Sequence, residues 1–81
     1  ELTKLNLSWC SSINDAAIEY ISDLTGLRSL NISSCRGVTN QSYSTLSELK
    51  QLRELDVSHC VNFTDKLRLK NLPSRDWTVL V

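Results

Sequence analysis

The chain has 81 residues, with nine Lys and Arg against nine Asp and Glu, so its formal net charge is zero. That length allows no more than one domain. The balanced charge argues against a general nucleic-acid binder or membrane-surface binder, because both classes need an excess of basic residues. No apolar stretch approaches the roughly 20 residues that a membrane-spanning helix needs. The sequence therefore predicts neither a nucleic-acid partner nor a membrane partner.

An internal repeat of 25 residues organises the chain. The three cysteines, Cys10, Cys35 and Cys60, are separated by two equal intervals of 25 residues. Cut at this period, each unit begins with Leu-x-x-Leu-x-aliphatic-x-x-Cys. Three matched copies make a far more specific signal than one short motif. The predicted units are repeat one (2–26), repeat two (27–51), an irregular repeat three (52–76) and the start of a fourth strand (77–81).

Repeat one sets the expected pattern. Leu5 and Leu7 alternate with polar residues, which predicts a short strand with one buried face. Asn14 is placed to cap a helix N-terminus, and Gly26 is placed to stop that helix. Apolar residues follow Asn14 at helical spacing, at Ile18, Ile21 and Leu24.

Repeat two follows the same order. Leu30 and Ile32 predict its strand, and Thr39 its helix cap. Its helix presents apolar residues at the three equivalent positions, Tyr43, Leu46 and Leu49. Each unit is thus a strand, a turn and a return helix, and stacked units would share one core.

Repeat three departs from this order after Leu55, Val57 and the expected cap Thr64. The 25-residue period predicts apolar residues at positions 68, 71 and 74. The residues there are instead polar: Arg68, Asn71 and Ser74. A return segment about two residues shorter would bring Leu69 and Leu72 inward, and Pro73 would interrupt a helix. At the 25-residue spacing, Trp77 and Leu80 of the fourth strand match Leu52 and Leu55.

This pattern resembles the leucine-rich repeat in its cysteine-containing form. It is similar to the repeats of F-box substrate receptors of ubiquitin ligases and of trypanosomatid leucine-rich repeat proteins. The resemblance implies an α/β solenoid, with parallel strands on a concave face and helices on a convex face. It also implies a non-catalytic protein-binding module without cofactor, part of a longer array. Such a module would recognise substrates for a ubiquitin ligase or serve a signalling regulator. The alternative is a structural spacer in a larger receptor or signalling enzyme.

The expected protein-binding surface is the concave strand face. Alternation turns three columns of polar residues away from the core, and a fourth column stands at the strand ends. The columns are Lys4, Ser29 and Glu54; Asn6, Asn31 and Asp56; Ser8, Ser33 and Ser58; and Trp9, Ser34 and His59. Trp9 is either packed on a neighbouring loop or an exposed aromatic anchor of the kind enriched in binding hot spots.

The remaining chemical motifs favour structural roles. The cysteines predict a buried ladder in which each S–H meets a loop carbonyl; a metal site and a disulfide are the less favoured alternatives. Asp56, Ser58 and His59 have the residue types of a nucleophile triad without its placement. The unpaired cysteines favour a reducing compartment, and hence a cytoplasmic or nuclear location. Four Asn-x-Ser/Thr sequons are interpreted as exposed polar residues rather than glycosylation sites.

Overall fold

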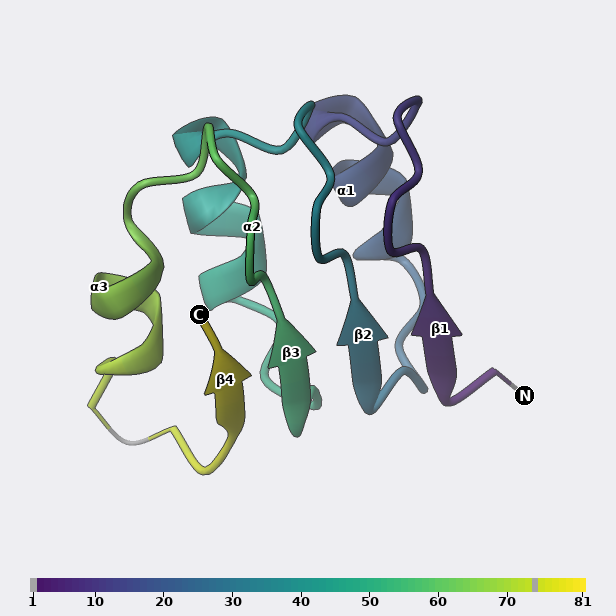
Figure 1. Ribbon diagram of the computed structural model, residues 1–81. Coiled ribbons are helices and arrows are strands. Elements are labelled where there is room, and N and C mark those ends of the chain that lie inside the picture. The colour runs from purple at the N-terminus through teal and green to yellow at the C-terminus, as the bar shows by residue number, and fades with distance from the viewer. Residues whose placement is uncertain (1, 74) are drawn as a thin grey trace.

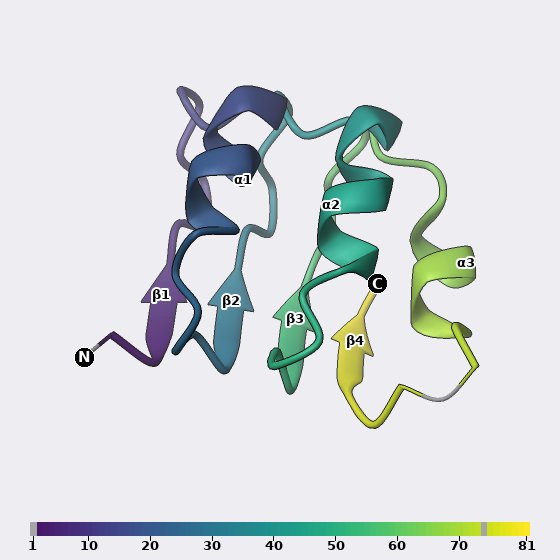
Figure 2. The ribbon, with the colours of Figure 1, turned by 180° about the vertical axis from the view of Figure 1, so that it is seen from behind.

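The computed structural model describes residues 2–73 and 75–81. They form one four-stranded parallel sheet in the order β1-β2-β3-β4. The strands are β1 (Lys4–Asn6), β2 (Ser29–Asn31), β3 (Glu54–Asp56) and β4 (Thr78–Leu80). The helices are α1 (Asp15–Ile21), the 3-10 turn η1 (Asn40–Ser42), α2 (Tyr43–Ser47) and α3 (Lys66–Lys70). Every helix lies on the same face of the sheet (Figures 1 and 2).

The core fills the space between the sheet and the helices. The middle residues of β2, β3 and β4 are buried in it, as are the apolar residues that follow β2 and β3. Leu5 and Leu7 are only partly buried; they lie on and just after β1, one of the two edge strands of the described sheet. The strands therefore present one apolar side to the helices and one polar side to solvent. We call this second side the concave face.

The first two repeats confirm their predicted helix starts. The side chain of Asn14 accepts a hydrogen bond from the Ala17 backbone at 3.0 Å, and Thr39 accepts one from the Gln41 backbone at 3.1 Å. The prediction that Gly26 stops the first helix is wrong. Helix α1 ends at Ile21, where the backbone N–H of Ser22 bonds the carbonyl of Ile18.

The third repeat is shortened, but its spacing to β4 is one residue shorter than the period, whereas the sequence predicts a return segment about two residues shorter. Leu69 is buried and Leu72 packs partly against the core. Thr64 does not cap the helix, because α3 begins only at Lys66 and the Thr64 hydroxyl instead accepts a hydrogen bond from Asn40 at 2.8 Å. Ser74, the last of the three positions that break the apolar pattern, lies outside the described residues.

The register of β4 corrects a prediction from the 25-residue spacing. Val79, not Leu80, pairs with Leu55, so the spacing from β3 to β4 is 24 residues. Val79 is 2% exposed and Leu80 is 54% exposed. Since side chains alternate along a strand, a shift of one residue turns the whole strand over. Thr78 and Leu80 therefore lie on the concave face.

One side-chain position joins each repeat to the next. The carboxylate of Asp15 accepts hydrogen bonds from the Thr39 backbone at 2.9 Å, the Thr39 hydroxyl at 2.6 Å and the Ser42 hydroxyl. One repeat later, Asn40 accepts bonds from the backbones of Thr64 at 2.8 Å and Asp65 at 3.0 Å. Asp15 and Asn40 thus fix the entries to the second and third helical segments against the repeat before each.

We predict that Asp15→Ala lowers the free energy of unfolding by about 1–3 kcal/mol, because three donors lose their acceptor. Partial burial acts to raise the pKa of Asp15, but the hydrogen bonds from Ser42 and Thr39 outweigh it and the pKa is lowered. A carboxylate with a lowered folded pKa stabilises the fold above its unfolded pKa, about 3.9, and this contribution is lost as the pH falls through the folded value.

Urea unfolding of the original chain and of Asp15→Ala, from pH 7 to pH 2.5, measures the difference in their free energies of unfolding. The deficit of Asp15→Ala should be constant at neutral pH and shrink below about pH 4. Asp65→Ala is the matched control: its carboxylate, at the equivalent position, makes one exposed ion pair with Arg68 at 3.9 Å. A deficit as large for Asp65→Ala, or one independent of pH, would contradict the assignment.

Candidate binding surface

The concave face carries the predicted polar columns in register. Lys4, Ser29 and Glu54 lie side by side on β1, β2 and β3. Asn6, Asn31 and Asp56 form the next column in the same way. None of the twelve predicted surface residues is buried. The sheet therefore presents to solvent the side chains that the alternation predicts.

The column at the strand ends is built by a repeated turn. In each unit an Asn or Asp at the end of the strand accepts a hydrogen bond from the backbone of the serine two residues later. The hydroxyls of Ser33 and Ser58 donate to the same side-chain oxygens, at 2.7 Å from Asn31 and 2.6 Å from Asp56. These serines thus shape the turn, and their hydroxyl protons are already committed within it.

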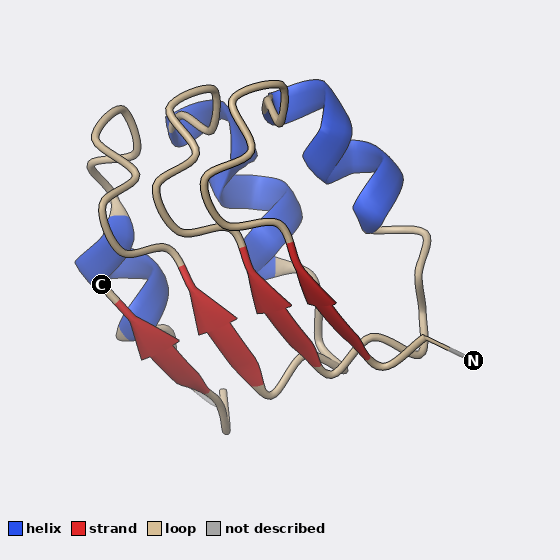
Figure 3. Ribbon diagram, turned by 45° about the vertical axis from the view of Figure 1, so that its right-hand side comes forward, coloured by secondary structure: helices blue, strands red, loops and turns tan. Residues whose placement is uncertain are grey.

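The residue after each turn has a left-handed backbone. The φ angles are 66° at Trp9, 61° at Ser34 and 59° at His59. This conformation costs a residue other than glycine about 1–2 kcal/mol. It is held by the neighbouring repeat, since the Trp9 backbone donates to the Ser33 carbonyl at 3.0 Å and the Ser34 backbone to the Ser58 carbonyl at 2.9 Å. The turns consequently stack in the same order as the strands (Figure 3).

These stacked turns enclose a shallow hollow of about 290 Å3. It is lined by Trp9, Ser34, Arg36, His59 and Val61. Trp9 is 79% exposed, so it does not pack on a neighbouring loop, and Val61 is 63% exposed. The sequence analysis missed Arg36 and Val61. Both residues directly follow a repeat cysteine and lie two positions after the Trp9, Ser34 and His59 column. A further column at that position would have predicted them.

A second hollow of about 160 Å3 lies on the concave face itself. Its outward-facing residues come from β2, β3 and β4: Ser29, Asn31, Glu54, Asp56, Thr78 and Leu80. It combines two carboxylates with the exposed side chain of Leu80. The sequence analysis missed Leu80 and Thr78, because the 25-residue spacing assigned Leu80 to the core. This corner can contact a basic group and an apolar group at once.

The Asp56, Ser58 and His59 group has the wrong connections for a nucleophile triad. In a triad the histidine lies between the serine and the acid. Here the Ser58 hydroxyl donates directly to Asp56 at 2.6 Å, and within the described residues no hydrogen bond joins His59 to either of them. The arrangement forms a turn and activates no nucleophile.

The cysteines form the predicted inward ladder. The Cys35 thiol donates to the Leu7 carbonyl at 3.2 Å, and the Cys60 thiol to the Ile32 carbonyl at 3.0 Å. Both side chains are buried, and burial raises the pKa of each thiol, which keeps it protonated as a donor. All three cysteines are free, and no cluster of metal-ligating side chains occurs in residues 2–73 and 75–81.

The basic segment of α3 is engaged with its neighbours. Arg68 lies over the ring of Tyr43, 4.5 Å from its centroid, and pairs with Asp65. The contact with Tyr43 joins α3 to α2. No helix in the described part of the chain is long and apolar enough to cross a membrane.

Comparison with known proteins identifies the repeat. Residues 2–22 and 49–66 match the family model described as Leucine Rich repeat. The first segment holds β1 and α1, and the second holds β3 and the turn after it. No curated protein and no solved structure matches the chain.

Cys35→Ala is expected to lower the free energy of unfolding by about 1 kcal/mol, through a lost packed sulfur and a lost weak hydrogen bond. Cys10→Ala is the matched control and should cost less, because Cys10 is only partly buried. Chemical unfolding with and without a zinc chelator should give the same stability. Stoichiometric metal that is lost in Cys35→Ala would contradict the structural role.

Proposed function

Since its matched segments and parallel sheet make this chain an α/β leucine-rich repeat solenoid, we propose that it binds a protein partner through the concave face, with Trp9 as the anchor. Leucine-rich repeats are typically non-catalytic and generally mediate protein–protein interaction. The observation that carries the proposal is the exposure of Trp9, 79%, at the rim of the strand-end hollow.

Trp9 supplies the large apolar area that the rest of the concave face lacks. The concave columns are mostly Ser and Asn, which form hydrogen bonds but bury little apolar area. Tryptophan offers the largest apolar area of any side chain and is enriched among binding hot spots. Val61 lines the same hollow and extends this apolar area. The left-handed backbone at Trp9 belongs to the repeat, since Ser34 and His59 share it, and is not itself evidence of binding.

The other end of the surface sets the partner's chemistry. Glu54, Asp56 and Leu80 line one hollow on the concave face. A partner with a basic residue would pair with these carboxylates, while an apolar groove on the partner would receive Trp9. Charge complementarity of this kind mainly raises the association rate, whereas the buried aromatic residue governs dissociation.

The test uses ligands selected from a random peptide library on the 81-residue chain, with affinities measured by calorimetry and association rates by stopped-flow mixing. Trp9→Gly should weaken binding by roughly 2 kcal/mol, or about thirtyfold. The same change should leave stability equal or higher, because glycine relieves the left-handed backbone. Asp56→Asn should mainly slow association and reduce its salt dependence, and Asn31 shows that Asn supports the turn.

Tyr20→Ala is the matched control, because Tyr20 is an aromatic residue of nearly equal exposure, 78%, on helix α1. It should leave the affinity unchanged, as should Glu48→Gln at the end of α2. Loss of binding in Tyr20→Ala together with normal binding in Trp9→Gly would contradict the concave-face proposal. A concave face that tolerates all of these changes would favour the structural-spacer alternative.

Finer roles rest on the repeat pattern alone. Recognition of a ubiquitin-ligase substrate, or of a signalling regulator's partner, is one form that this binding would take. We also propose that the repeat array is longer, which is supported by the partly covered Leu5 and Leu7. An intracellular location is likewise a proposal, supported by thiol hydrogen bonds at Cys35 and Cys60 that a disulfide would remove.

A further inference from the structure

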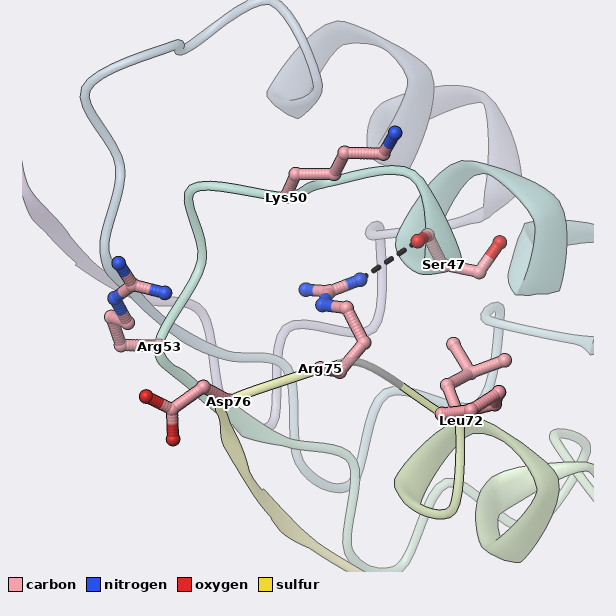
Figure 4. Close-up of a pocket in the computed structure, with 7 residues that line it drawn as sticks. Ser47, Lys50, Arg53, Leu72, Arg75 and Asp76 are labelled. Atoms are coloured by element: carbon pink, nitrogen blue, oxygen red, sulfur yellow. Dashed lines mark hydrogen bonds between the residues drawn. The ribbon is translucent and has the colours of Figure 1, made fainter.

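A third, larger hollow lies at the opposite edge of the sheet, where the strands begin. It encloses about 540 Å3 between the end of α2 and the segment that joins α3 to β4. In Figure 4, Ser47, Lys50 and Arg53 come from the end of α2 and the loop after it, and Leu72, Arg75 and Asp76 come from the segment between α3 and β4. The lining residues are Ser47, Lys50, Arg53, Leu72, Pro73, Arg75 and Asp76. This is the place where the third repeat departs from the repeat pattern.

Three of these side chains are cationic and only Asp76 is anionic. Within residues 2–73 and 75–81, no carboxylate lies within 4.0 Å of the charged groups of Lys50, Arg53 or Arg75. Burial lowers the pKa of Arg75, and repulsion from Arg53 lowers it further. Arg53 and Arg75 are therefore close enough to repel each other, and a bound anion would relieve that repulsion.

Arg75 forms the rigid base of the hollow. Its guanidinium donates to the carbonyls of Ser47 at 2.7 Å and Leu49 at 2.8 Å, and it stacks 3.6 Å from the centre of the Trp77 ring. Figure 4 marks the first of these contacts, the bond to Ser47 at the end of α2. They hold the guanidinium in place without neutralising its charge, because their acceptors are uncharged carbonyls.

Lys50 and Arg53 are the other two cations of the hollow, and both side chains are exposed. The equivalent arginine one repeat earlier is Arg28. Its guanidinium donates hydrogen bonds to the carbonyls of Thr25 at 3.4 Å and Leu27 at 3.5 Å. Arg53 makes no such contact to its own loop within the described residues and instead lines the hollow. Its guanidinium is thus available for a two-point contact with a carboxylate.

We infer that this hollow binds an acidic segment of a protein partner, with a carboxylate held by Lys50 and Arg53 over the fixed Arg75 and an adjacent apolar side chain on Leu72 and Pro73. This docking surface lies apart from the concave face and does not depend on partner binding there. The charge of the cationic hollow is complementary to the segment, and the apolar wall distinguishes it from a site for a small free anion.

The test uses the 81-residue chain and two blocked peptides, Glu-Glu-Leu-Glu-Glu and Gln-Gln-Leu-Gln-Gln, followed by amide chemical-shift mapping. The glutamate peptide should bind weakly, on the order of 1 mM, and shift the amides of Arg53 and Asp76 without shifting those of Asn6 and Trp9. The glutamine peptide should not bind. Inorganic phosphate is the third probe and should bind more weakly than the glutamate peptide.

Paired variants separate binding from folding. Arg53→Gln should weaken binding of the glutamate peptide at least about fivefold. Arg28→Gln, at the equivalent position, should not change that affinity. Asp76→Asn should strengthen binding about two- to fivefold, a gain that no unfolding can produce. Trp9→Gly should have no effect on this peptide.

Several results would overturn the inference. They are no binding of the glutamate peptide, equal binding of the glutamine peptide, tighter binding of phosphate, or equal effects of Arg53→Gln and Arg28→Gln. Each of these can occur while the concave face still binds its own ligands, so the two surfaces are tested separately.

Discussion

The stacking of equivalent strand-end turns is the interaction on which the rest of the structure depends. Each strand has only three residues, too few to fix its position by sheet hydrogen bonds alone. The pairing continues past the strands, through the bond from the Trp9 backbone to Ser33 and from the Ser34 backbone to Ser58. Just after these turns, the thiols of Cys35 and Cys60 donate hydrogen bonds to carbonyls of the preceding repeat. A residue's role thus follows from its position in the repeat.

This constraint explains how much the sequence could predict. In the first three strands the period is constant, so the polar columns, the core residues and the cysteine ladder follow from alternation and spacing. The period also predicts the caps at Asn14 and Thr39, since a side-chain oxygen at that position meets the first free backbone donors. These predictions need no knowledge of how distant residues pack.

Of the predictions that failed, the Thr64 cap and the phase of β4 depend on packing between repeats, whereas the end of α1 is a local feature. Thr64 is drawn away from its helix by Asn40, and the stop of α1 is set by its own carbonyls rather than by Gly26. The phase of β4 depends on where Leu69 and Leu72 seat against the core, which the spacing alone cannot fix. That one-residue shift places Leu80 beside Glu54 and Asp56, and changes the chemistry of the concave face.

The net charge of zero conceals a division of charge between two surfaces. The carboxylates of Glu54 and Asp56 lie on the concave face, while Lys50, Arg53 and Arg75 surround the hollow at the strand starts. The composition excludes a general polyanion binder, yet each surface has a local charge of its own. Partner selection by such a chain depends on where its charges lie rather than on their sum.

The register of β4 is the most direct test of this account. The stacked arrangement pairs Val79 with Leu55 and places Val79 in the core, whereas the 25-residue spacing would place Leu80 there. Urea unfolding of Val79→Asp and Leu80→Asp would compare them. Stacking predicts that Val79→Asp loses about 3 kcal/mol or more, since a charge enters the core, and that Leu80→Asp changes stability by less than about 0.5 kcal/mol. A severe loss in Leu80→Asp with near-normal stability in Val79→Asp would contradict it.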